Sequence, residues 1–246
     1  EHIRDDSWYI NSAECIPVSF LPDPKIHGII ELKSDGYDIT ALDAAFPVLH
    51  GRYGEDGTVQ GLIELAGIPL IGCDTLSSAL CMDKNKAHKL VSQTGILTPK
   101  SVVITEASQL HIYSDFIKKL GFPLFVKPVR AGSSFGISKV MHEQQLEAAI
   151  NLAFSYDSQI IIEEYIEGFE VGCAIIGNND LIIGEVDEIE LSDGFFDYTE
   201  KYTLKSSKIH MPARIDADTA NRIKKTAAMI YRTLGCKGFA RVDMFL

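Results

Sequence analysis

The chain contains 246 residues, of which 46% are hydrophobic and 23% are charged. This composition excludes a disordered chain, which would combine low hydrophobicity with high charge, and no run of about 18 apolar residues is present to cross a membrane. The balance of 23 Lys and Arg against 34 Asp and Glu gives a net charge of −11, which argues against a general binder of nucleic acid or of an anionic membrane surface.

The five cysteines indicate a reducing cellular compartment and give no sign of a metal site or of a disulfide framework. They are scattered and form neither a Cys-x-x-Cys pair nor a cluster with histidine, so the sequence predicts no zinc site and no disulfide framework. No basic stretch followed by an apolar one opens the sequence, so no signal peptide is visible. We therefore expect a cytoplasmic protein with reduced thiols and with neither a nucleic-acid nor a membrane partner. The cysteines are Cys15, Cys73, Cys81, Cys173 and Cys236.

Short strands alternate with amphipathic helices along the chain, which is the pattern of an α/β protein. We expect an N-terminal domain over residues 1–74. Within it, residues 46–49 read as a buried strand, and apolar residues at helical spacing predict a helix over 59–66. Residues 68–72 are predicted to form a second short buried strand.

A central subdomain is expected over residues 75–163. Apolar spacing predicts one helix over 77–94, a second through Leu110, Ile117 and Leu120, and a third through Leu146, Ile150 and Ala153. The predicted strands of this subdomain are residues 101–105, 122–129 and 137–140.

A C-terminal subdomain is expected over residues 164–246. Its final strand, at 239–246, places Phe239, Arg241, Asp243 and Phe245 on one face. The sequence stops inside this strand, so we expect a piece of a longer protein. The other predicted elements are strands at 159–166, 170–176 and 181–190, a long polar-aromatic loop at 193–205, and a helix over 216–234.

Lys127 is unusual because it lies in an otherwise apolar strand. A buried ammonium costs several kcal/mol unless an anion compensates it. The loop at 132–136, with sequence Gly-Ser-Ser-Phe-Gly, follows this strand. Glycines let backbone N–H groups approach phosphate oxygens, and hydroxyls donate further hydrogen bonds. Together they indicate nucleotide phosphates, although Lys127 on an edge strand could also reach solvent.

Two further sets of charged residues extend this hypothesis of a nucleotide site. Glu163, Glu164 and Glu170 surround the end of an apolar strand and could accept hydrogen bonds from an adenine amino group or from ribose hydroxyls. A solvated strand end is the alternative.

Arg241 and Asp243 either form an ordinary salt bridge or take part in catalysis, in which Asp243 would hold Mg²⁺ and Arg241 would stabilise an oxyanion. No P-loop motif is present, and the isolated histidines are interpreted as structural or surface residues.

Seven motifs in a fixed order resemble the D-alanine–D-alanine ligase family, a branch of the ATP-grasp enzymes. The similarity extends over nearly the whole chain and is weakest in residues 1–40 and 100–120. Residues 187–213 are most similar to the D-alanine–D-serine ligases of VanG-type vancomycin resistance. The motifs are Phe46-Pro47-Val48-Leu49-His50-Gly51, Gly54-Glu55-Asp56-Gly57-Thr58-Val59-Gln60-Gly61, Cys81-Met82-Asp83-Lys84, Val126-Lys127-Pro128, Ala131-Gly132-Ser133-Ser134-Phe135-Gly136, Phe195-Phe196-Asp197-Tyr198-Thr199-Glu200-Lys201-Tyr202 and Arg241-Val242-Asp243.

The resemblance implies an α/β ATP-grasp fold, in which the remainder of an N-terminal α/β domain is followed by two α+β subdomains that clasp ATP. It also implies roles for individual residues. ATP would be bound by Lys84, Lys127, Ser133, Ser134, Gly136, Glu163, Glu164, Ile166, Glu170 and Lys201. Catalysis would involve Arg241, Ser133 and Tyr202. The substrate would be bound by His50, Glu55, Tyr202 and Arg241. The metal ion would be bound by Asp243.

The resemblance further implies a two-step ligation with ATP and Mg²⁺, or Mn²⁺ in its place. D-alanine would be phosphorylated on its carboxylate, and D-serine would attack the acyl phosphate to give D-alanyl-D-serine for peptidoglycan precursors, with vancomycin resistance as the result. Family members resemble homodimers, so a homodimer is expected. A D-alanine–D-alanine ligase and a non-catalytic nucleotide-binding ATP-grasp protein remain the alternatives.

Two segments of the family pattern are absent from the sequence. One is an N-terminal glycine-rich segment with a Glu that binds the ammonium group of the first D-alanine. The other is a C-terminal segment with a Glu-x-Asn pair that completes the Mg²⁺ sites.

Overall fold

The computed structural model describes residues 15–191 and 207–246. The predicted loop at 193–205, with Lys201 and Tyr202, lies outside the described residues. The chain divides into two compact units, the first extending to Phe46 and including Gly61–Ile71, the second comprising Pro47–Gln60 and Gly72–Leu246. No helix in the described part of the chain is long and apolar enough to cross a membrane.

The first unit contains a three-stranded antiparallel sheet in the order β1 (Val18–Phe20), β2 (Gly28–Lys33) and β3 (Gly36–Ala41). The sequence did not reveal these strands, because every residue of β3 is exposed and no apolar alternation marks it. The predicted strands at 46–49 and 68–72 are wrong: a single parallel bridge between Ala45 and Leu70 stands in their place.

The helix α1 (Thr58–Leu65) is confirmed, and Ile63 and Ala66 are buried as its apolar spacing predicts. The loop before it is held by Gln60, whose side-chain amide donates to the Gly54 carbonyl at 2.8 Å and accepts from the Gly57 N–H at 3.1 Å.

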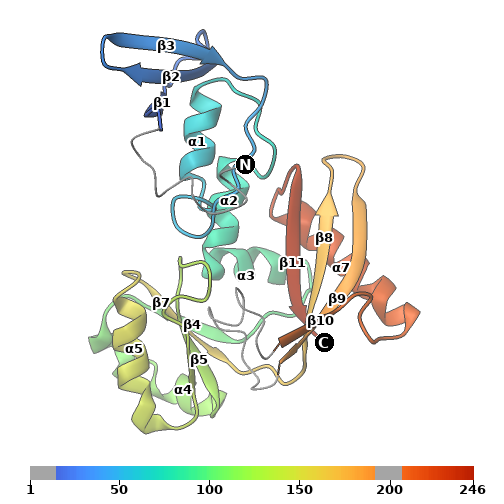
Figure 1. Cartoon of the computed structure of the whole chain (residues 1–246). Helices are drawn as coiled ribbons and strands as arrows, with labels where there is room; N and C mark the ends of the chain where they lie inside the picture. The colour runs from blue at the N-terminus through green and yellow to red at the C-terminus, as the bar shows by residue number, and fades with distance from the viewer. Residues whose placement is uncertain (1–14, 192–206) are drawn as a thin grey trace. The chain divides into compact units, whose positions relative to one another are not determined.

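The second unit contains two four-stranded antiparallel sheets (Figure 1). The first has the order β4-β7-β5-β6 and is covered by α4 (Ser114–Leu120) and α5 (Leu146–Phe154). Leu124, Val126 and Ile162 point into the core under these helices. The alternate residues of the same strands face away from α4 and α5. The strands are β4 (Ser101–Ile104), β5 (Leu124–Pro128), β6 (Ser138–Val140) and β7 (Ile160–Glu164).

The second sheet of this unit has the order β10-β9-β8-β11 and is covered by α7 (Ala217–Thr233). Cys173, Ile175 and Val242 pack with Tyr231 of α7, whose hydroxyl donates to the Gly177 carbonyl at 2.7 Å. The face opposite α7 carries Arg241 and Asp243 together with the apolar side chains of Phe239 and Phe245. The strands are β8 (Glu170–Ile176), β9 (Ile182–Leu191), β10 (Ser207–His210) and β11 (Phe239–Phe245).

Two predicted helices are each interrupted. The single helix expected over 77–94 is in fact α2 (Thr75–Met82) and α3 (Lys84–Ser92), because Asp83 between them has an extended backbone, with φ −84° and ψ 95°. Its buried carboxylate caps α3 by accepting from the Lys86 N–H at 2.9 Å. The helix expected through Leu110 to Leu120 is a 3-10 helix, Ala107–His111, followed by α4.

Candidate functional site

A cavity of about 410 Å³ in the second unit is lined by residues of both four-stranded sheets. This volume suits a small-molecule ligand. Lys127 reaches it from β5, Glu163 from β7 and Phe245 from β11, so residues far apart in the sequence line the same cavity. Six of the residues expected to bind ATP line the cavity: Lys127, Ser134, Glu163, Glu164, Ile166 and Glu170.

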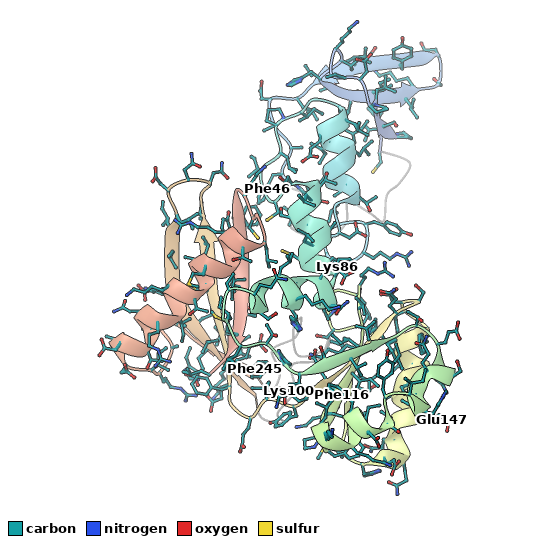
Figure 2. All side chains as sticks on the ribbon, turned by 180° about the vertical axis from the view of Figure 1, so that it is seen from behind. Phe46, Lys86, Lys100, Phe116, Glu147 and Phe245 are labelled. Atoms are coloured by element: carbon teal, nitrogen blue, oxygen red, sulfur yellow. The ribbon has the colours of Figure 1, made fainter. Side chains whose placement is uncertain are left out.

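The apolar walls of the cavity were missed by sequence reasoning, which looked for charged residues. Phe125 lies on the same face of β5 as Lys127, and Phe245, labelled in Figure 2, contributes from β11. The period-two spacing of Phe125 and Lys127 is the signal that could have identified the first of these. Ile137, Phe169 and Ile189 also line the cavity, so a flat aromatic group would find apolar contacts there.

Lys127 lies on an interior strand, since β5 is flanked by β7 and β6. The alternative of an edge-strand lysine is therefore wrong. The Lys127 ammonium pairs with Glu163, and the exposed fractions of the two side chains are 21% and 4%. The anion that compensates the buried ammonium thus belongs to the protein itself. The second carboxylate oxygen of Glu163, Oε2, is buried without a hydrogen-bond partner, so this group is left to accept a donor.

Lys84 is the first residue of α3 and reaches the strand end that follows Lys127. Its ammonium donates to the Ala131 carbonyl at 2.8 Å, and its backbone N–H donates to the Val129 carbonyl at 3.2 Å. Asp83, which also pairs with the side chain of Lys86, fixes the start of the helix. Lys84 is therefore held beside the loop at 130–136.

The loop at 132–136 turns through left-handed backbone at Ser133 (φ 51°), Ser134 (φ 58°) and Gly136 (φ 70°). Consecutive residues in such conformations can turn their N–H groups toward one concave surface, which suits an anion. Gly132 approaches a second loop, because a Cβ at this position would lie 2.8 Å from the Cα of Gly51. The two loops therefore touch through glycine backbones.

Glu55 belongs to that second loop and closes it. Its Oε2 accepts from the Gly51 N–H at 2.5 Å, while the Glu55 N–H donates to the Gly51 carbonyl at 2.8 Å. His50 precedes this turn and is exposed. Two of the four predicted substrate residues, His50 and Glu55, thus lie in one loop beside the serine loop, and the Glu55 carboxylate is partly engaged within its own turn.

Glu164 is fixed at the end of β7. Its Oε1 accepts from the Lys100 N–H at 2.8 Å, and its Oε2 lies 3.7 Å from the Lys100 ammonium. Ile166 and Glu170 follow on the connection to β8, where Glu170 is paired in register with Phe245 of β11. The short segment between the two sheets therefore carries three of the predicted nucleotide contacts.

Arg241 lies across the open face of the second sheet between two carboxylates. Its Nη2 lies 3.0 Å from Asp187 Oδ2, and its Nε lies 2.9 Å from Asp243 Oδ1. Gly172 of β8 lies between them in register, and a Cβ at that position would collide with the Arg241 guanidinium and with Asp187. The absence of a side chain at Gly172 is what allows Arg241 to cross β8. The sequence prediction found the pair of Arg241 and Asp243 but missed Asp187.

Arg214 and Glu188 form a second charged cluster at the cavity that the sequence did not reveal. The Arg214 Nη2 lies 2.5 Å from Glu188 Oε1, and the Arg214 N–H donates to Glu188 Oε2 at 3.0 Å. These hydrogen bonds from Arg214 lower the pKa of Glu188. Glu190 bonds to His210 at 2.6 Å, which lowers the pKa of Glu190.

His88 of α3 is a further residue whose environment the sequence concealed. Its Nδ1 is buried without a hydrogen-bond partner. Burial lowers the pKa of His88, the charge of Glu163 opposes this shift, and the charges of Lys127 and Lys84 reinforce it. The imidazole is therefore neutral near pH 7 and adds no third positive charge beside the two lysines.

The residues that could hold a metal ion are few in the described ranges. No group of three or more His, Cys, Asp or Glu with suitable geometry occurs there. Mg²⁺ is commonly bound through one or two carboxylates together with substrate phosphates and water. The half-exposed carboxylate of Asp243, whose exposed fraction is 52%, fits such a partial set.

Solved structures of known ligases share this fold. The crystal structure of the VanG D-Ala:D-Ser ligase from Enterococcus faecalis is 57% identical with a TM-score of 0.89, and the match covers 99% of this chain and 70% of that chain. The D-alanine–D-alanine ligase of Bacillus anthracis complexed with ATP is 36% identical with a TM-score of 0.70, over 83% of this chain and 64% of that chain. The protein is thus an ATP-dependent ligase with the ATP-grasp fold.

Family models identify the particular group of ligases. The model described as "D-ala D-ala ligase N-terminus" matches residues 7–73, and "D-ala D-ala ligase C-terminus" matches residues 90–246. The vancomycin B-type resistance protein VanB of Enterococcus faecalis is 48% identical over 95% of this chain and 68% of its own length. The chain belongs to the D-alanine–D-alanine ligase family.

Proposed function

We propose that this ligase joins D-alanine to D-serine through a D-alanyl phosphate intermediate. The observation that carries the choice of D-serine is the 57% identity to the VanG D-Ala:D-Ser ligase, against 36% to the Bacillus anthracis D-alanine–D-alanine ligase. The dipeptide D-alanyl-D-serine would enter peptidoglycan precursors and confer vancomycin resistance.

ATP is proposed to bind in the cavity with its adenine between the apolar side chains of Phe125 and Phe245. The unpartnered Oε2 of Glu163 would accept from the adenine amino group, with the backbone near Ile166 as its neighbour. Glu170, at the start of β8, would accept from the ribose hydroxyls. The buried, unsatisfied oxygen supports this orientation, since such groups are rare in folded proteins.

The phosphates of ATP would then extend toward Lys127, Lys84 and the serine loop. The left-handed backbone at Ser133 and Ser134 supports an anion site there, with Gly136 completing the turn. Lysines that offset the charge of two meeting anions are the usual means of phosphoryl transfer. Lys201 would join them from the loop at 193–205.

The first D-alanine is proposed to lie near His50, Glu55 and Ser133, with Tyr202 completing the network. The contact between the Gly51 and Gly132 backbones supports this, because it brings the Glu55 turn against the serine loop. The Glu55 carboxylate would orient this loop, and Ser133 would hydrogen-bond the substrate.

Arg241 is proposed to stabilise the oxyanion formed when the amine of D-serine attacks the acyl phosphate. Loss of an oxyanion donor costs about 10²–10³ in turnover. Asp243 would be a ligand of Mg²⁺ or Mn²⁺, which when bound neutralises phosphate charge. Asp187 would keep Arg241 in place when Asp243 turns to the metal.

We further propose a cytoplasmic homodimer, with an N-terminal domain over residues 1–74 and ATP-grasp subdomains over 75–163 and 164–246. Within the described residues the five cysteines form no disulfide, as is usual in a reducing compartment. The two four-stranded sheets support the two subdomains, since each sheet lies in one proposed range apart from Glu164, the last residue of β7.

A competition assay tests the second substrate. The full-length protein is given ATP, Mg²⁺ and D-alanine with equal concentrations of D-serine and D-lactate, and the products are separated and quantified. D-alanyl-D-serine should predominate. Mainly D-alanyl-D-alanine would support the ordinary ligase of the family instead.

D-lactate is included because a putative D-alanine–D-lactate ligase of Streptomyces coelicolor is 45% identical over 99% of this chain and 72% of its own length. An amine and a hydroxyl nucleophile differ in their protonation at neutral pH. A product ratio that shifts from depsipeptide to dipeptide as the pH rises would identify mixed use of both classes.

A further inference from the structure

Three thiols from two segments that are distant in the sequence, Cys73 with Cys81 and Cys236, lie close together in the second unit. The Sγ atoms of Cys81, near the end of α2, and Cys236, before β11, lie 3.8 Å apart although 155 residues separate them. Cys73 lies beside them, with its Sγ 3.7 Å from the Phe239 carbonyl oxygen. The sequence had shown these cysteines only as scattered residues.

The two segments that carry the thiols are fixed against each other. The Lys237 ammonium pairs with Asp74 Oδ2 at 2.6 Å, next to Cys236 and Cys73. A Cβ at Gly238 would lie 2.7 Å from the Gly72 nitrogen, so the two backbones are in close contact. A disulfide needs sulfurs about 2.05 Å apart, and side-chain rotation can close the remaining gap.

Cys81 and Cys236 are unequal in access and acidity. Cys81 is exposed and Cys236 is buried. The hydrogen bond from Cys236 lowers the pKa of Cys81, against the opposing effect of burial. For Cys236, the hydrogen bond from Cys73 lowers the pKa, but Cys81 and burial outweigh it and raise the pKa of Cys236 to about 12. The exposed sulfur is therefore the better nucleophile.

We propose that Cys81 and Cys236 form a reversible redox site that a small disulfide, such as oxidised glutathione, converts into an intramolecular disulfide. The Cys81 thiolate attacks one sulfur of the oxidant, forming a mixed disulfide and releasing one glutathione thiolate. Cys236 then loses its proton to solvent and attacks the Cys81 sulfur, releasing the second glutathione thiolate. The protein loses two electrons and two protons, and the oxidant becomes two thiols.

The position of this site connects it to the reaction, a step that rests on the proposed function. Cys81 lies three residues before Lys84, and Cys236 lies five residues before Arg241. A bond between them ties the segment that places Lys84 to the start of the strand that places Arg241. A displacement of about 1 Å in a positioning group can cost about 10²-fold in rate, so we expect oxidation to lower turnover by about tenfold.

Peptide mapping tests the chemistry without any activity measurement. The full-length protein is treated with oxidised glutathione, remaining thiols are alkylated, and the chain is cleaved before aspartate. Cleavage at Asp74 and Asp83 separates Cys73 from Cys81. We expect a cross-linked pair of peptides, 74–82 with 218–242, that disappears with dithiothreitol. Alkylated Cys81 and Cys236 after treatment, or a bond between Cys73 and Cys236 instead, would overturn the proposal.

Single variants test the effect on turnover. In Cys81→Ser and Cys236→Ser, glutathione disulfide should leave turnover unchanged, whereas Cys73→Ser, the matched control, should retain the loss of about tenfold and its recovery with dithiothreitol. A cross-link without loss of turnover would contradict the regulatory effect. If the protein has no ligase activity, the cross-link is still detected by mapping, so failure of the proposed function and failure of the redox site remain distinct.

Discussion

Lys127 and Glu163 form the most buried ion pair near the cavity, with side-chain exposures of 21% and 4%. Removing one member of a buried pair leaves the other charge uncompensated, which typically costs about 3–5 kcal/mol. The two residues therefore stabilise the folded protein through their ion pair, in addition to the proposed contacts with ATP.

This dual role gives the first prediction. Lys127→Met should destabilise the protein by about 3–5 kcal/mol and weaken ATP binding. The double variant Lys127→Met with Glu163→Gln should recover most of the stability but not the affinity. Chemical denaturation and nucleotide titration measure the two effects. A double variant that binds ATP normally would show that neither side chain contacts the nucleotide.

Asp187 gives a second prediction at the same scale. Asp187→Asn removes the carboxylate that holds Arg241 while Asp243 serves the metal, so kcat should fall by about tenfold with little change in KM for ATP. Glu185→Gln, on the same strand but paired with Lys224 of α7 at 3.1 Å, is the control and should leave kcat unchanged. Equal losses in both variants would indicate a general effect on β9.

At the scale of elements, the Asp83 cap shows how a local break in a helix positions a residue of the site. Helical spacing alone predicted one helix over 77–94, because apolar periodicity does not register a single extended residue. The break lets Asp83 cap α3 and set Lys84 at its first position. Within the described residues, strands rich in buried apolar residues, such as β5, β7 and β8, were predicted within about two residues. The exposed β3 was not, because no apolar alternation marks it. Asp187, the partner of Arg241, was not, because its position depends on the register of strands that are distant in the sequence.

Asp83→Ala should therefore lower both stability and ATP affinity, whereas loss of a helix cap away from the site should lower stability alone. Loss of an N-cap costs about 0.5–2 kcal/mol, and the displaced Lys84 should also weaken ATP binding. Asp216→Ala removes the corresponding cap of α7, which accepts from the Thr219 N–H at 2.8 Å, and should lower stability without altering affinity. Thermal denaturation and nucleotide titration of both variants compare them directly. Unchanged affinity in Asp83→Ala would separate Lys84 from the nucleotide.

The contact between Arg214 and Glu188, a residue of β9, predicts how the stability of the protein changes at acidic pH. The pKa of Glu188 is lowered in the folded protein by its hydrogen bonds from Arg214. The stability that it contributes is therefore complete above the ordinary Glu pKa of about 4.3 and is lost as the pH falls through the lowered folded value. Glu188→Gln should lower stability at pH 7 by about 1–2 kcal/mol and reduce the further loss between about pH 5 and pH 3. Denaturation curves across this range measure both.

At the scale of the whole molecule, the described part of the cavity lies within the second unit. A nucleotide that binds only the folded state stabilises it by mass action, by about 2.7 kcal/mol at a hundredfold excess over Kd. That stabilisation should reach the elements that line the site and leave the sheet of the first unit untouched. The order of predicted strands and helices places a boundary near residues 73–75, although no charge run or linker marks it.

Hydrogen exchange with and without a non-hydrolysable ATP analogue tests this distribution. We expect slower exchange in β5, β7 and the loop at 130–136, because their amides lie at the proposed adenine and phosphate positions. Exchange in β1, β2 and β3 should not change, since these strands contribute no residue to the cavity. The double variant at Lys127 and Glu163 is the control and should show little protection at the same analogue concentration. Protection that is equal in both units would mean that the nucleotide acts on the fold as a whole, and protection confined to β1–β3 would place the site outside the cavity.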